Sequence, residues 1–195
     1  MGLLDFLFGK PKTYDQRNTS AALTAGGGRS LAQRHTVSPR QRKENVLDLR
    51  LGGVVTYNAT DFIVRSRYVY EDHGFSWFSY HFVDSISGEK FWIDAQDDDE
   101  LEVAVVKPIR LQVSAPVASR LVHEGVTYTQ DEHGYAKVLI ESEDSDPKYS
   151  EVEYWDFYDD DDEKVLGVER WGNDFEVTAG YYIEPYELTI LSTGD

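Results

Sequence analysis

Residues 75–84 read FSWFSYHFVD, and this stretch decides the fold class. Half of its side chains are Phe, Trp or Tyr rings, and successive side chains of a strand point to opposite faces. A strand of this composition carries large rings on both faces. We expect both faces to be buried, in a sandwich or a roll. The alternative is an exposed aromatic strip that binds a peptide, a glycan or an apolar partner.

Similar runs rich in Val, Ile, Tyr, Phe and Trp extend in both directions, separated by clusters of Gly, Asp, Asn and Ser. Glycine-containing turns flank the opening stretch on both sides. The sequence therefore predicts an all-β, antiparallel β-sandwich or roll with almost no helix. The strands are expected at 46–51, 53–58, 61–70, 75–84, 89–95, 101–108, 125–130, 134–141, 150–158, 164–171, 174–180 and 186–192.

The second half of the chain echoes the first at nearly constant offsets of 71 to 75 residues. A repeat of this period indicates duplication of one sheet unit, with chance similarity between β-rich halves as the alternative. We predict two tandem related units, at about 46–115 and 120–195. The echoes pair Gly53–Tyr57 with Gly125–Tyr128, Phe82–Asp84 with Phe157–Asp159, and Leu101–Val103 with Phe175–Val177.

Charge divides the chain into two parts. The net charge is −17, yet residues 1–45 hold eight Lys or Arg against three Asp or Glu, which leaves −22 for residues 46–195. We predict a flexible basic arm over 1–45 and an acidic body over 46–195. The body is not expected to bind nucleic acid directly, because phosphate contacts need Lys and Arg.

The first residues of the arm form a short apolar tip. We expect this tip to pack on the protein itself or on a protein partner. Membrane contact is expected only through residues 2–8, since one short apolar turn binds bilayers weakly. With no cysteine and no stretch of about 20 apolar residues, the chain is expected to be cytoplasmic, at most peripheral to the membrane. The candidate contact residues are Leu3, Leu4, Phe6, Leu7 and Phe8.

The body also resembles a prokaryotic family known as domain of unknown function 4178, over residues 46–192. The resemblance implies a compact β-rich bacterial protein without assigned activity, from a family often encoded beside membrane-stress and polyamine-synthesis genes. The motifs that carry it are LGGVVTY at 51–57, WFSYHF at 77–82, GEKFWI at 88–93, VEYWDFY at 152–158 and ERWG at 169–172.

No catalytic or cofactor motif is present in the sequence. The sequence does not match the phosphate-binding loop, the nucleophile elbow or the zinc-protease motif. The five histidines do not pair at a metal-ligand spacing. Acidic runs at 97–100 and 159–163 lack the spacing of a calcium loop, so we interpret them as solvated hairpin tips that oppose edge-to-edge aggregation. We expect no cofactor and no metal.

Arg65 and Arg67 alternate on one predicted strand and are unusual in so acidic a body. We expect ion pairs with carboxylates of a neighbouring strand. The alternative is a small anion or carboxylate site.

Three functions fit these observations. The first is a non-enzymatic protein-interaction module with an unidentified partner, linked through the family resemblance to membrane stress or polyamine metabolism. The second is an enzyme or enzyme accessory that binds a cationic small molecule, such as a polyamine, through carboxylates. This second hypothesis is weakened because acidic residues cluster in predicted turns and not inside strands. The third is an acidic mimic of nucleic acid.

Overall fold

The computed structural model describes residues 45–84, 86–88, 90–97 and 100–194. This part of the chain is almost entirely antiparallel strand, as predicted. The strands are β1 (Val54–Tyr57), β2 (Thr60–Asp72), β3 (Phe75–Asp84), β4 (Lys90–Asp97), β5 (Leu101–Pro108), β6 (Arg120–His123), β7 (Val126–Ser142), β8 (Ser145–Tyr158), β9 (Lys164–Trp171), β10 (Asp174–Ile183) and β11 (Thr189–Ser192), with 3-10 turns η1 (Val46–Asp48) and η2 (Pro185–Glu187).

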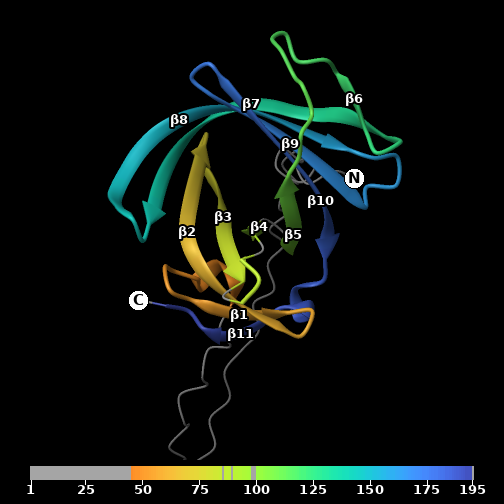
Figure 1. Cartoon of the computed structure of the whole chain (residues 1–195). Coiled ribbons are helices and arrows are strands. Elements are labelled where there is room, and N and C mark those ends of the chain that lie inside the picture. Colours follow the sequence, from red (N-terminus) through yellow and green to blue (C-terminus); the bar gives the residue numbers. More distant parts are fainter. Residues whose placement is uncertain (1–44, 85, 89, 98–99, 195) are drawn as a thin grey trace, which may run out of the picture. The chain divides into compact units, whose positions relative to one another are not determined.

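The eleven strands form one sheet in the order β11-β1-β2-β3-β4-β5-β10-β9-β8-β7-β6, and an additional pairing joins β2 to β7. That pairing closes the eight strands β2–β5 and β7–β10 into a ring. β1 and β11, from opposite ends of the described chain, lie side by side in Figure 1 and pair in antiparallel register. The predicted sandwich or roll is thus one continuous rolled sheet.

Each half of the ring is a four-stranded meander. The halves meet at two seams, β5 with β10 and β2 with β7. Two of the sequence echoes fall at matching places in the two meanders. Phe82–Asp84 and its echo span the ends of β3 and β8, and Leu101–Val103 and its echo lie at the starts of β5 and β10. The remaining echo pairs β1, which lies outside the ring, with the start of β7, which belongs to it. Duplication therefore stays a prediction.

Two apolar cores cover the outer face of the ring. In the first half, β1, η1 and residues beside η2 pack over alternate side chains of β2–β5, among them Tyr80 and Phe82. In the second half, residues 109–117 and β6 pack over alternate side chains of β8–β10, among them Trp155 and Phe157. Apolar burial on this scale stabilises the fold through the hydrophobic effect. The inner face carries two smaller apolar clusters and also the polar residues described below.

The strand predictions at 46–51, 125–130, 134–141 and 186–192 were wrong in detail. At the last, Pro185–Glu187 form η2 and the strand begins at Thr189. Residues 46–48 form a 3-10 turn because the Asn45 side chain accepts a hydrogen bond from the Leu47 N–H and caps it. The strands predicted at 125–130 and 134–141 are one strand, β7, which passes Gln130 and Glu132 through a bulge. β6 was not predicted.

Within the described residues, no helix is long and apolar enough to cross a membrane. The apolar tip at residues 2–8 and the basic arm lie outside the described residues, so the predictions made for them stay predictions.

Candidate functional site

The inner face of the ring is set by strand alternation. In β4 the side chains of Ile93 and Ala95 are buried in the outer core, so Asp94 between them points inward. Asp94 pairs with Ala104 of β5 on one side and Ser79 of β3 on the other. The Ser79 hydroxyl donates a hydrogen bond of 2.5 Å to Asp94 Oδ1. A carboxylate is thus held inside the closed sheet.

Two more carboxylates reach the inner face from the second half. Asp156 lies in β8 between Trp155 and Phe157, whose rings belong to the outer core. Glu169 follows Val168 of the same core in β9. Both side chains therefore point inward. The sequence-based expectation that acidic residues avoid strand interiors was wrong at these positions, because side-chain alternation allows an acid beside a buried ring.

Aromatic rings surround these carboxylates. Tyr68 of β2 contacts Trp92 of β4 at 5.0 Å and Trp171 of β9 at 6.2 Å between ring centroids. β2 and β9 are not neighbours in the sheet, so the second contact crosses the interior. Tyr158 and Tyr182 stack at 6.4 Å with an interplanar angle of 8°. The inner face is therefore lined by tyrosine and tryptophan rings as well as acids.

Glu169 has a hydrogen-bond donor on its own strand. The Trp171 indole N–H donates a hydrogen bond of 3.0 Å to Glu169 Oε2. Tyr70 is only 3% exposed, and its hydroxyl is close enough to Glu169 to influence the pKa of both groups. Since Tyr70 belongs to β2 and Glu169 to β9, this interaction too crosses the interior. Both neighbours favour the ionised carboxylate, yet they do not offset the cost of removing it from water.

The surrounding protein raises the pKa of all three carboxyl groups. Desolvation is the largest cause in each, and it raises the pKa of Asp94 to about 6 and that of Glu169 to about 7. The pKa of Asp156 is raised well above its ordinary value by desolvation, and further by the carboxylates of Glu132, Glu169 and Asp94. All three side chains nevertheless keep partial accessibility to water. The three residues thus remain partly accessible although desolvation is the main cause of their raised pKa values.

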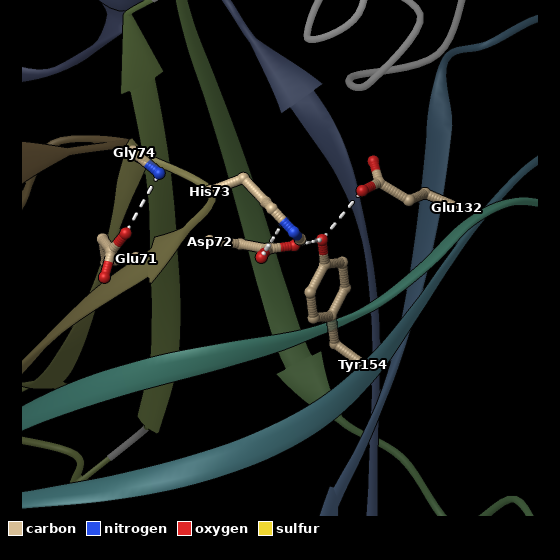
Figure 2. Close-up of polar contacts among 6 residues, drawn as sticks. All are labelled: Glu71, Asp72, His73, Gly74, Glu132 and Tyr154. Carbon is tan, nitrogen blue, oxygen red and sulfur yellow. Dashed lines mark hydrogen bonds and ion pairs between the residues drawn. The ribbon is translucent and has the colours of Figure 1, made fainter.

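A fourth inward carboxylate, Glu132 of β7, lies at the seam between the halves. Figure 2 shows the Tyr154 side chain pointing at both Asp72 and Glu132, with His73 turned toward Asp72. The Tyr154 hydroxyl lies 3.1 Å from Asp72 Oδ2 and 2.8 Å from Glu132 Oε1, and His73 Nδ1 lies 2.5 Å from Asp72 Oδ1. A hydroxyl has one hydrogen to donate, so the two carboxylates compete for it.

This competition is relieved when Glu132 is protonated. Desolvation raises the pKa of Glu132, and the neighbouring Asp72 and Asp131 charges raise it further, against the lowering effect of Tyr154. Glu132 Oε2 is buried and has no hydrogen-bond partner within the described residues. A proton or a bound cation would satisfy that oxygen.

The arrangement suits two kinds of chemistry. Desolvated carboxylates attract positive charge strongly, because the interaction is little screened by water, and aromatic faces bind organic cations through their quadrupole. A carboxyl group with a pKa near 7 also suits proton transfer. Among the described residues, no three acidic or histidine side chains are arranged to hold a metal ion.

The candidate residues Arg65 and Arg67 lie on β2, away from this interior. Arg65 Nη1 is 2.5 Å from Glu143 Oε2, and Arg67 Nη1 is 2.6 Å from Glu141 Oε2. The Arg67 guanidinium also lies 4.9 Å above the Phe78 ring. Glu141 belongs to β7 and Glu143 follows its end, so both contacts tie the β2–β7 seam.

His73 and His133, the two histidines that lie in acidic segments, have separate partners. His73 pairs with Asp72 at the β2–β3 turn, whereas His133 Nε2 is 2.9 Å from Glu153 Oε1 on the outer face. The His133 ring stacks on Trp155 at 4.7 Å. Glu153 also accepts from Tyr135 and pairs with Arg170, and these donors lower its pKa against the effect of burial.

Comparison with known proteins places the chain in a family. The model of the family described as Domain of unknown function (DUF4178) matches residues 50–185, about seven-tenths of the chain. The chain belongs to this family. Uncharacterized proteins of Mycobacterium bovis and of two strains of Mycobacterium tuberculosis are each 28% identical to it over 147 residues, covering 71% of this chain and 69% of theirs. No solved structure matches.

Membership in a family of unknown function supplies no chemistry, so the inner face has to be interpreted from its own residues. Sequence reasoning missed Asp94, Asp156 and Glu169 as a group. A usable signal was present: each is an acid inside a predicted strand and directly follows a large apolar residue at 93, 155 or 168. Strand alternation places such an acid on the face opposite that core residue.

Proposed function

We propose that this protein binds a small organic cation on the inner face of its closed sheet, as a binding protein or an enzyme accessory. The observation that carries the proposal is the grouping of Asp94, Asp156 and Glu169 among tyrosine and tryptophan rings. Desolvation raises the pKa of all three, and neighbouring carboxylates raise those of Asp156 and Glu169 further. In the described part of the chain, no ion pair is formed by any of the three.

A cation bound between them would relieve the repulsion among these carboxylates. Indole and phenol rings would cover its methylene or methyl groups, as aromatic cages do for alkylammonium ions. A linear amine with two or three ammonium groups matches several separate carboxylates better than a single small ion does. Spermidine is therefore a suitable first probe.

Isothermal titration calorimetry of the full chain with spermidine tests the proposal. We expect saturable binding at pH 8, weakened at least tenfold in the Asp94→Asn/Glu169→Gln double variant, which is about 1.4 kcal/mol. The matched control is Asp146→Asn/Glu151→Gln, which removes the same charge from exposed positions of β8. Equal loss in both variants, or no binding by the unaltered protein, contradicts the proposal.

Loss of fold can be separated from loss of binding. The inner variant removes two carboxylates that are costly to ionise, so its thermal midpoint at pH 8 should equal or exceed that of the unaltered protein. Weaker binding together with an unchanged or higher midpoint identifies the inner face as the site. The protein-interaction role expected from the sequence, with the apolar tip and basic arm as a second contact outside the described residues, stays a prediction.

A further inference from the structure

A hollow of about 290 Å³ lies at one end of the ring. Its walls come from the β4–β5 turn, the β8–β9 turn and the chain between β10 and η2. The residues that line it are Glu100, Leu101, Glu102, Val103, Asp162, Tyr182, Ile183, Glu184 and Pro185.

The hollow has a strongly acidic lining. It includes carboxylates from Glu100, Glu102, Asp162 and Glu184, and none of the residues that line it is basic. The two acidic runs of the sequence, interpreted above as separate hairpin tips, thus each contribute to one hollow. Carboxylates gathered around a concave surface focus a negative potential there and raise the local concentration of cations.

Tyr182 connects this hollow to the inner face. It pairs in register with Ala104, which pairs with Asp94, so the three residues form one row across β10, β5 and β4. Its pKa is raised by desolvation and by the charges of Glu102 on the side of the hollow and of Asp156 and Asp94 on the inner side. The phenol therefore stands between the two acidic groups.

The Tyr182 hydroxyl is also available to a ligand. Its oxygen is buried and makes no hydrogen bond of normal geometry within the described residues, although the Tyr158 hydroxyl is close enough to influence its pKa. A buried hydroxyl without an acceptor or donor is costly and usually has a reason. An ammonium group passing or resting at this point would supply the missing partner.

The opposite end of the ring carries charges of both signs. There β4 begins at Lys90, and desolvation together with the Lys90 charge lowers the pKa of His81 on β3. Asp144 of the β7–β8 turn and Asp174 at the start of β10 lie at the same end. The hollow differs from that end because its lining holds several carboxylates and no basic residue.

We propose that the hollow beside Tyr182 is the entrance through which organic cations reach the inner carboxylates. This inference rests on the proposed function. Glu100 and Glu184 attract the cation, and Tyr182 separates the entrance from the inner face. Electrostatic attraction at an entrance acts mainly on the association rate, and it weakens as salt screens the charges.

Stopped-flow tryptophan fluorescence with spermidine tests the entrance on the full chain. In 20 mM salt we expect Glu100→Gln/Glu184→Gln to associate at least threefold more slowly than the unaltered protein, with the difference lost in 0.5 M salt. The matched control is Asp144→Asn/Asp174→Asn, which removes equal charge from turns at the other end and should leave the association rate unchanged.

Every other outcome contradicts either the entrance alone or both the entrance and the proposed function. Equal slowing in both variants shows that only net charge attracts the ligand, and it overturns the entrance. An unchanged rate in the Glu100/Glu184 variant overturns it as well. If the unaltered protein binds spermidine while the entrance variant behaves normally, the proposed function survives and the entrance alone fails. If the unaltered protein does not bind spermidine, both fail.

Discussion

The Trp171 indole donates a hydrogen bond of 3.0 Å to Glu169 Oε2, and the two residues lie on the same face of β9 two positions apart. This short local contact holds a carboxylate toward the interior of a closed sheet. Tyr70, from the first half of the ring, is close enough to influence the pKa of Glu169. An acid placed there is costly to ionise, and the first prediction follows from that cost.

Stability should fall as the pH rises from about 4.5 to 7. Glu169 has an ordinary pKa of 4.5 and a folded pKa of about 7, and Asp94 moves from 3.8 to about 6. Within these windows the folded chain keeps protons that the unfolded chain has released, so each unit of pH lowers the free energy of unfolding. At about 1.4 kcal/mol per pKa unit, each group contributes at most roughly 3 kcal/mol.

Urea unfolding at pH 5 and pH 8 measures this dependence. The unaltered protein should be more stable at pH 5, and Asp94→Asn/Glu169→Gln should reduce the difference. Asp84 and Glu153, whose pKa values are lowered, act in the opposite sense below about pH 4.5. His81, whose pKa is lowered mainly by desolvation, also acts in the opposite sense below about pH 6.5 and offsets part of the fall. A double variant that keeps the full pH dependence would show that other groups cause it.

The Tyr154 hydroxyl should stabilise the seam between the halves. Tyr154→Phe leaves Asp72 Oδ2 and Glu132 Oε1 without their shared donor, and a loss of about 1–3 kcal/mol is expected for partly buried acceptors. Tyr149→Phe, at a side chain 82% exposed, should change stability by less than about 0.5 kcal/mol. Equal effects of the two substitutions in urea unfolding would contradict this role.

How much of this could be predicted differs between fold and site. Alternation around Phe75–Asp84 and the glycine turns indicate antiparallel strands, because those signals are local. Closure through β2 and β7 could not be predicted, since it joins residues about 70 positions apart. The inner acids were missed for the same reason. The Asp94 charge raises the pKa of Asp156 only because the closed ring brings both side chains to one interior.

Arg67 and Arg65 of β2 should differ in their contributions to the free energy of unfolding. Arg67 is 8% exposed and packs against Phe78 as well as Glu141, so Arg67→Met should cost on the order of 2 kcal/mol by leaving the Glu141 carboxylate without its cation. Arg65 forms a more exposed pair, and Arg65→Met should cost less than about 1 kcal/mol. Chemical unfolding of both variants checks the order, and a reversed order would contradict the burial argument.

The most direct test of cation binding on the inner face uses the indole N–H signals of the four tryptophans in a proton–nitrogen correlation spectrum. Spermidine added at pH 8 should shift the signals of Trp92 and Trp171, whose rings contact Tyr68 on the inner face. Both shifts should follow the same saturation curve. The signal of Trp155, in the outer core, should not move. Saturable shifts confined to Trp155, or no saturable shift at any indole, would contradict the proposal that the interior binds the cation.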